Sequence, residues 1–128
     1  MSVTVADLMV DAVIVAREED TLGEVREKMV AYDIGAVPVV DRDGLLSGIV
    51  TSDDLVSSYP LTLPISRVMS TPVQTLPPDA EIRRAARQMR RFRHHHMVVV
   101  DQRRIVGILS SWDLLRLVEK QVEIQKLS

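Results

Sequence analysis

The sequence contains no cysteine, few aromatic residues and no long hydrophobic run. Of its 128 residues, 46% are hydrophobic but only 3% are aromatic. The lack of cysteine excludes a disulfide framework and a thiolate metal site. No apolar stretch approaches the roughly 20 residues that a membrane helix needs, and the first seven residues do not resemble a secretion signal. We therefore expect a compact folded domain in the cytoplasm, without a membrane partner.

The sequence also lacks the usual signatures of catalysis. It shows no nucleophile–base pair, glycine-rich phosphate loop or paired carboxylates at a recognisable spacing, and it has only five glycines. We expect no enzymatic activity, no catalytic residue, no bound metal and no required cofactor.

Charge is distributed unevenly along the chain. Residues 1–60 hold 12 Asp or Glu and 4 Lys or Arg, a net charge of −8, whereas residues 61–128 hold 6 and 12, a net charge of +6. Six arginines fall between Arg83 and Arg93. This basic segment can be a solvated helix face, a surface that attracts anions, or one half of a homodimer contact between an acidic and a basic repeat. The low aromatic content and the overall charge of −2 argue against a nucleic-acid partner.

The sequence contains nearly the same pattern of residues twice, about 60 residues apart. Met9 matches Met69, Met29 matches Met89, and the run Val39–Asp41 matches Val99–Asp101. A repeat of this length is one supersecondary unit used twice. We place repeat 1 at residues 1–60 and repeat 2 at residues 61–128. Because each repeat is too small to close a core alone, we expect the two to pack together and form clefts.

Each repeat has the pattern of a small α/β unit. The apolar spacing of Leu22, Val25 and Met29 predicts a helix with one face on a sheet, capped by Asp20 or Thr21. The second copy of this helix has a fuller apolar stripe, with Asp79 as its expected N-cap, and the stripe consists of Ile82, Ala85, Ala86, Met89 and Phe92.

Two short apolar runs around a polar turn follow each helix and predict a β-hairpin. These runs are 37–40 and 45–50 in repeat 1, and 97–100 and 105–109 in repeat 2. Pro38 lacks an N–H, so we expect it at a strand start or a sheet edge. A final helix begins near Ser52 in repeat 1, where it is short, and at Ser111 in repeat 2, where it is long.

The junction of the last strand and last helix carries the sharpest motif. Thr51 and Ser110 are each followed three residues later by an acid, Asp54 or Asp113. A hydroxyl and an acid at this spacing can simply cap a helix. The same geometry can also bind a ligand, because free N–H groups at a helix start attract phosphate and a carboxylate can accept bonds from two neighbouring hydroxyls.

With these motifs the chain resembles a pair of cystathionine-β-synthase (CBS) domains, also called a Bateman module. The resemblance runs from about Val5 to Leu117 and is carried by "IGAVPVVD" at 34–41, "GIVTSDDL" at 48–55 and "GILSSWDL" at 107–114. It implies tandem CBS repeats, each a small sheet packed with helices, related by pseudo-twofold symmetry. It also implies a regulatory module that binds AMP, ADP, ATP or S-adenosylmethionine in clefts between the repeats.

The resemblance implies roles for particular residues. Asp54 and Asp113 would hold ribose hydroxyls, and Thr51 and Ser110 would meet the ribose or phosphate. The base would lie near the first strand of each repeat and a neighbouring strand edge, at Ala12, Val13, Ala36, Val37 and Pro38 or at Pro72, Val73, His96, Met97 and Val98. Repeat 2 departs from the family pattern at Val98, where proline is common.

The run His94-His95-His96 and Trp112 remain open to several interpretations. On a strand, His94 and His96 would share a face and His95 would point away. The histidines can be surface residues without a task, two metal ligands, or contacts for a ligand phosphate through His95 and His96. Trp112 is either a hydrophobic lid on the last helix or a ligand contact.

We therefore expect a sensor that binds an adenosine-containing ligand without chemistry and passes its occupancy to a regulated protein or to its own homodimer. The alternative is a structural protein–protein interaction module whose clefts stay empty.

Overall fold

A computed structural model describes residues 3–127 and the side chains of residues 3–120. The chain divides into two compact units, and each unit takes segments from both repeats. Unit 1 comprises residues up to 13, residues 74–101 and the residues from 106 onward, and unit 2 comprises residues 14–73 and 102–105. The division in space is therefore different from the division into repeats along the sequence.

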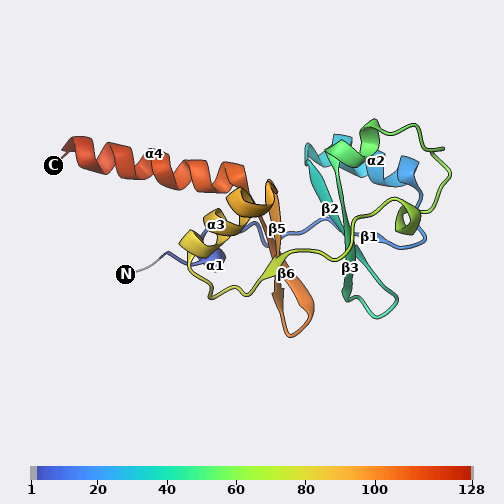
Figure 1. The fold of residues 1–128 in the computed structure, drawn as a ribbon, viewed down its shortest axis with the longest axis horizontal. Helices are drawn as coiled ribbons and strands as arrows, with labels where there is room; N and C mark the ends of the chain where they lie inside the picture. Colours follow the sequence, from blue (N-terminus) through green and yellow to red (C-terminus); the bar gives the residue numbers. More distant parts are fainter. Residues whose placement is uncertain (1–2, 128) are drawn as a thin grey trace. The chain divides into compact units, whose positions relative to one another are not determined.

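Unit 2 is a three-stranded sheet with helices on one side (Figure 1). Its sheet has the order β1-β2-β3, with β1 parallel and β3 antiparallel to the central strand. Its elements are β1 (Ala16–Arg17), α2 (Leu22–Tyr32), β2 (Ala36–Val40), β3 (Leu46–Thr51) and two short 3₁₀ helices, η1 (Ser52–Val56) and η2 (Ile65–Arg67).

Unit 1 repeats this architecture with a longer final helix. Its sheet has the order β4-β5-β6, and β4 is parallel to β5. Its elements are α1 (Val5–Leu8), β4 (Thr75–Leu76), α3 (Ile82–Phe92), β5 (His96–Asp101), β6 (Arg104–Ser110) and α4 (Ser111–Leu127). The α/β class, the two hairpins and the short and long final helices are thus as predicted. Within the described residues, no helix combines the length and the apolar character needed to cross a membrane.

The predicted helix faces form the cores. Leu22, Val25 and Met29 are buried on α2, as expected. On α3, Ala85 and Met89 are buried, but Phe92 is 45% exposed. The apolar stripe of α3 is therefore narrower than predicted, because Ala86 is also exposed.

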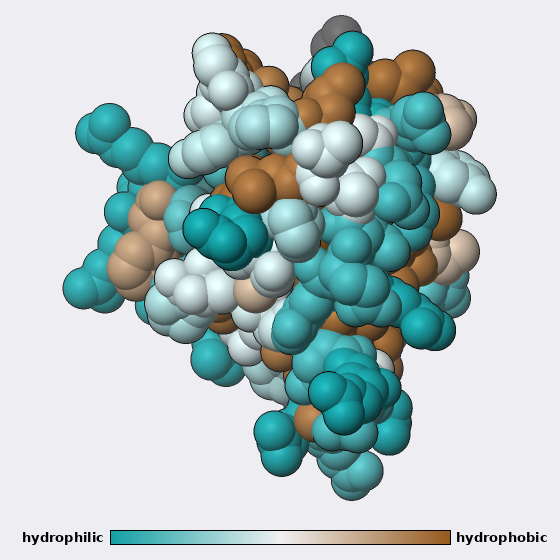
Figure 2. Space-filling model, turned by 90° about the vertical axis from the view of Figure 1, so that its right-hand side faces the viewer, coloured by the Kyte–Doolittle hydropathy of each residue, from teal (hydrophilic) through white to brown (hydrophobic). Residues whose placement is uncertain are grey.

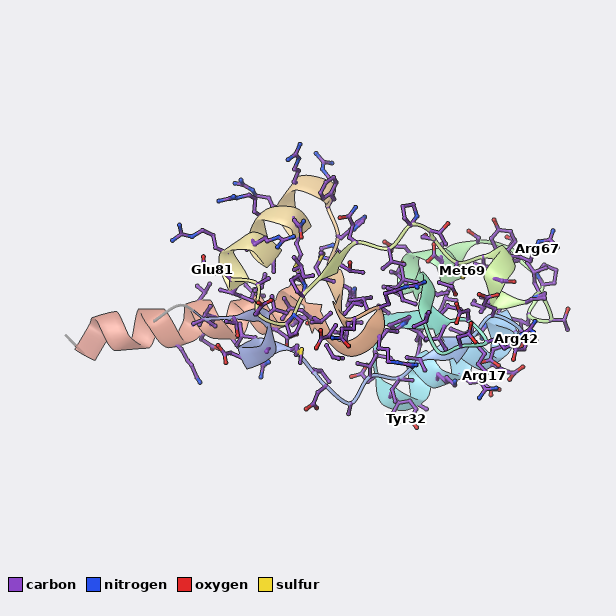
Figure 3. The ribbon with its side chains drawn as sticks, turned by 90° about the horizontal axis from the view of Figure 1, so that it is seen from below. Arg17, Tyr32, Arg42, Arg67, Met69 and Glu81 are labelled. Carbon is purple, nitrogen blue, oxygen red and sulfur yellow. The ribbon has the colours of Figure 1, made fainter. Side chains whose placement is uncertain are left out.

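The two equivalent helices begin differently. Thr21 caps α2, as predicted, and its hydroxyl accepts a bond from the Glu24 N–H at 3.2 Å. The prediction that Asp79 caps α3 is wrong, since the N-cap is Glu81 at the start of the helix (Figure 3). The first N–H of α3, that of Ile82, donates to the Val3 carbonyl at 2.9 Å, so the N-terminal segment replaces a side-chain cap.

Pro38 lies in the middle of β2 rather than at a strand start or a sheet edge, so that prediction is wrong in its simple form. Strand β1 pairs only with Val39 and Val40, whereas β3 pairs along the whole of β2. At Pro38, β2 therefore has a neighbouring strand on only one side. A missing N–H is tolerated at such a position.

Each unit's core is completed by a residue from the other repeat. Val5 of α1 is fully buried with the core residues of repeat 2, and Ile65 of η2 is fully buried with those of repeat 1. Backbone bonds hold both segments: the Val5 N–H donates to the Ala80 carbonyl at 2.8 Å, and the Ile65 N–H donates to the Asp20 carbonyl at 2.7 Å. The first short helix of each repeat is thus exchanged for that of the other.

Two glycines accept the methionines that follow the exchanged segments. A Cβ on Gly107 would overlap the sulfur of Met9, and a Cβ on Gly48 would overlap the sulfur of Met69. Met69 follows η2 and lies beside β3 (Figure 3). Neighbouring bridges, Val10 with Ile108 and Ile49 with Ser70, keep these close contacts in place.

We predict that Gly107→Ala destabilises the protein by about 1–3 kcal/mol, the usual cost of overpacking a core. Urea unfolding measures the change. The variant Met9→Ala should cost less in the Gly107→Ala background than in the wild type, because the overlap is then gone. Independent, additive effects of the two substitutions would contradict the contact.

Candidate functional site

The matched hydroxyl and acid form the same hydrogen-bond pattern in both units. In unit 2 the Thr51 N–H and hydroxyl donate to Asp54 Oδ2 at 2.8 and 3.3 Å. In unit 1 the Ser110 N–H and hydroxyl donate to Asp113 Oδ2 at 2.8 and 3.1 Å. The motif therefore does cap the helix start, as the simpler interpretation predicted. Since capping uses only one carboxylate oxygen, the second oxygen can accept a bond from a different partner.

The second oxygen distinguishes the two aspartates. Asp113 Oδ1 accepts from Arg116 Nη2 at 2.7 Å, and the Asp113 side chain is 9% exposed. Among the described residues, Asp54 Oδ1 accepts no hydrogen bond, and Asp54 is half-buried. Sequence reasoning missed Arg116, although its position one turn after Asp113 on a predicted helix is a usable signal.

A backbone bond joins each helix start to the segment before the central strand. The Ser111 N–H donates to the His95 carbonyl at 2.9 Å, and the Ser52 N–H donates to the Gly35 carbonyl at 3.0 Å. Asp113 is therefore held close to the start of β5, where its charge acts on His96.

The other predicted ligand residues divide between the two units. Unit 1 contains Ala12, Val13, His95, His96, Met97 and Val98 together with Ser110 and Asp113. Unit 2 contains Ala36, Val37, Pro38, Pro72 and Val73 together with Thr51 and Asp54. Through the exchange, each unit combines the strand edge of one repeat with the N-terminal segment of the other.

The first strands lie later in the sequence than we predicted. Strand β1 begins at Ala16 and β4 at Thr75, so Ala12, Val13, Pro72 and Val73 precede them. Before these segments, Val10 pairs with Ile108 of β6, and Ser70 pairs with Ile49 of β3. Ala12 and Pro72 are exposed in these connections, while Val13 and Val73 are half-buried.

The histidine run lies mostly before its strand. Because β5 begins at His96, the predicted alternation of His94 and His96 on one strand face does not apply. His94 and His95 are exposed and His96 is half-buried. Burial lowers the pKa of His96 below 6.5, the charge of His95 lowers it further, and the charge of Asp113 opposes both. The described residues contain no cluster of three or more potential metal ligands.

Trp112 is 75% exposed on α4, so it does not act as a lid over the core of unit 1. Sequence reasoning did not identify a pocket of about 490 Å³ in unit 1, which is lined by apolar and basic side chains. It is lined by Ala86, Met89, Arg90, Arg93, His94, His95, Ser111 and Leu114. In unit 2, a pocket of about 350 Å³ lies beside the hairpin at Arg17 and Arg42 (Figure 3).

The sequence model of the CBS-domain family matches the chain twice, at residues 5–60 and 65–120. The chain belongs to the CBS-domain family. The two matches cover most of the sequence, and each includes one motif with the hydroxyl and the aspartate.

Known proteins similar to this pair differ in length. A homoserine O-acetyltransferase of Methanococcoides burtonii is 34% identical over 117 residues, which are 90% of this chain and 24% of that enzyme. The CBS domain-containing protein YhcV of Bacillus subtilis is 29% identical over 116 residues, 87% of this chain and 82% of YhcV. The chain thus spans about a quarter of the enzyme's length but most of the length of YhcV.

A solved structure extends the likeness to a ligand-bound pair. The CBS domain pair of protein MJ0100, in complex with 5′-methylthioadenosine and S-adenosyl-L-methionine, has a TM-score of 0.87 and 28% identity. The match covers 94% of this chain and 99% of that chain. The tandem CBS architecture is therefore established.

The depressed pKa of His96 predicts a loss of stability in mild acid. The unfolded chain takes up a proton near pH 6.5, while the folded chain resists it until a lower pH. The His96 contribution is therefore complete above about pH 6.5 and is lost as the pH falls through the folded pKa. Urea unfolding between about pH 7.5 and 5 should show this loss.

The variant His96→Gln should flatten this part of the profile. His94→Gln is the matched control, because it removes an exposed imidazole from the same run. An unchanged pH profile in His96→Gln would show that burial of His96 does not matter for stability.

Proposed function

We propose that this chain is a regulatory module that binds an adenosine-containing ligand and performs no chemistry of its own. The single observation that carries the proposal is the matched pair of helix-start aspartates, Asp54 and Asp113, each with one oxygen used for capping. The likeness to the MJ0100 pair, whose ligands both contain adenosine, supports the class of ligand.

The ribose is the part of the ligand that these aspartates suit. Two neighbouring hydroxyls donate to one carboxylate, and hydrogen bonds to a charged group contribute about 1.5–3 kcal/mol each. Asp54 Oδ1 is open to such a bond in unit 2. In unit 1 the ligand shares Asp113 with Arg116, whose side chain is 64% exposed.

The base and the phosphate of the ligand contact a different set of residues in each unit. In unit 2 the base lies near Pro72 and Val73 and the start of β2 at Ala36, Val37 and Pro38. In unit 1 it lies near Ala12 and Val13 and the start of β5 at His96, Met97 and Val98. Because the strand side chains are mostly buried, their backbone groups make the contacts. Thr51 or Ser110 meets the ribose or phosphate, and His95 and His96 meet a phosphate in unit 1.

Occupancy of these sites regulates either a separate protein or a homodimer of the chain. Ligand binding stabilises the folded state by about 2.7 kcal/mol at 100 times the dissociation constant. Thermal unfolding with AMP, ADP, ATP and S-adenosylmethionine therefore tests the proposal directly. A shift with at least one ligand is expected. No shift with any of them would favour a structural interaction module with empty sites.

For the ligand found in this screen, Asp54→Asn and Asp113→Asn should together weaken binding at least tenfold. Asparagine keeps an oxygen that accepts the capping bonds and removes the charged acceptor for ribose. Isothermal titration calorimetry measures the affinity, and circular dichroism checks the fold. Asp53→Asn, at an exposed neighbouring position, is the control and should bind like the wild type. Wild-type affinity in the double variant would rule out the ribose role.

Nucleotide affinity should increase as the pH falls from about 8 to 6. A phosphate beside His95 and His96 stabilises the protonated imidazole, so binding and protonation favour each other. Calorimetric titrations with ADP should show this dependence, and titrations with adenosine should show much less. The double variant His95→Ala, His96→Ala should remove the difference. Equal pH dependence for both ligands would show that these histidines do not contact phosphate.

A further inference from the structure

The pocket of about 350 Å³ in unit 2 lies where the hairpin of its sheet turns. Arg17 of β1 pairs with Val40, the last residue of β2, and Arg42 follows two residues later in the turn. Figure 3 shows Arg17 and Arg42 beside each other at this end of the unit. The residues that line the pocket are Arg17, Glu19, Val40, Asp41, Arg42 and Gly44. The pocket therefore combines basic, acidic and apolar side chains.

The charges in this pocket do not neutralise each other. Among the side chains that the structure describes, no ion pair includes Arg17, Arg42 or Glu19, and all three side chains are exposed. Asp41 is half-buried and also forms no ion pair in this part of the chain. Groups of both signs thus face one pocket and remain open to a ligand that carries both charges.

Hydrogen bonds from the backbone fix the two turns that carry these groups. Asp20 Oδ2 accepts from the Arg17 N–H at 2.9 Å, which holds the turn after β1. Asp41 Oδ1 accepts from the N–H groups of Asp43 and Leu45 at 2.9 and 3.0 Å, which holds the hairpin turn. The backbone of the pocket is therefore ordered before a ligand arrives, and this lowers the entropic cost of binding.

The pocket is distinct from the proposed adenosine site of unit 2. Thr51, in that site, pairs with Ala36 at the start of β2, whereas Val40 at the end of β2 pairs with Leu46. Strand β2 has five residues, so its two ends are about 13 Å apart at roughly 3.3 Å per residue. The two sites therefore lie at opposite ends of one strand.

Repeat 2 does not contain the same charges. The residues that match Arg17 and Arg42, 60 positions later, are Pro77 and Gln102. Neither carries a charge, so the pair of arginines is a feature of unit 2 and not of the framework that the two repeats share.

We infer that this pocket binds a free amino acid through its carboxylate and its ammonium group. The guanidinium groups of Arg17 and Arg42 have the planar geometry that binds a carboxylate through paired hydrogen bonds. Glu19 accepts from the ammonium group, and Asp41, which uses one oxygen for the turn, adds negative charge beside it. Val40 contacts the side chain of the amino acid. The inference does not depend on the proposed adenosine ligand.

A small zwitterion suits the pocket better than an anion or a protein partner. Phosphate or a dicarboxylate would meet two acidic side chains as well as the arginines, and contact between like charges is unfavourable. The volume is at the lower end of the roughly 300–1,000 Å³ that is typical of ligand pockets. Figure 2, which views the molecule from the side of unit 2, shows hydrophilic residues over most of its lower part. A protein partner would favour a contiguous hydrophobic patch instead.

Titration of the isotope-labelled chain with a panel of the standard L-amino acids tests the inference by NMR. At least one amino acid should shift the backbone amide signals of Arg42 and Gly44 and leave those of Thr51 and Asp54 unchanged. For the amino acid that binds most tightly, the analogue without the amino group and the analogue without the carboxylate should each bind at least tenfold more weakly.

Variants of the lining residues separate the two halves of the ligand. The double variant Arg17→Gln, Arg42→Gln should weaken binding at least tenfold, and Glu19→Gln should weaken it at least threefold. The matched controls are Arg26→Gln and Glu27→Gln, which remove exposed charges from α2 outside the pocket and should bind like the wild type. Circular dichroism verifies the fold of each variant.

Three outcomes would overturn the inference. The first is that no amino acid shifts the signals of Arg42 and Gly44. The second is that inorganic phosphate, or the analogue without the amino group, binds as tightly as the amino acid, which would make the pocket a simple anion site. The third is that Arg26→Gln weakens binding as much as the double variant does, which would show an effect of overall charge alone.

Discussion

The exchange of the short N-terminal helices is the constraint on which the rest of the fold depends. Val5 completes the core around repeat 2, and Ile65 completes the core around repeat 1. Both are fully buried, and burial of such a side chain contributes about 1.5–3 kcal/mol. A single repeat would lack this residue and the backbone bonds beside it. The structure thus gives a specific reason why the sequence needs two copies of a unit that is too small to close a core alone.

The same exchange decides which candidate residues can act together. Ala12 and Val13 follow α1 and so share a unit with Ser110 and Asp113 rather than with Thr51 and Asp54. The close packing of Met9 on Gly107 fixes the position of this segment against β6. A substitution at Gly107 would therefore disturb the proposed site of unit 1 as well as the core. Stability and the proposed ligand binding would then depend on one shared contact in this region.

Local patterns in the sequence predicted the local structure well. The spacing of Leu22, Val25 and Met29 gave the buried face of α2, and the hydroxyl three residues before Asp54 or Asp113 gave the helix starts. These features depend on residues within one turn of each other. The incorrect cap at Asp79 had a distant cause, because the chain around Val3 and Val5 supplies the bonds at the start of α3. Contacts between distant segments are also the reason why the first strands begin later than predicted. For the same reason, each unit contains candidate residues from both repeats. No local pattern encodes such contacts.

The two repeats keep one hydrogen-bond framework and differ in what surrounds it. The bonds from Ser52 to Gly35 and from Ser111 to His95 are equivalent, as are the two caps at Asp54 and Asp113. By contrast, Arg116 forms an ion pair with Asp113 in unit 1, whereas the residue that matches Arg116 in repeat 1 is Ser57, which carries no charge. Arg93 and His95 likewise match Asp33 and Gly35. Because backbone bonds define the framework, side chains around it can change without loss of the fold. The difference in phosphate contacts that we propose for the two units therefore follows from a few charged side chains on a shared backbone.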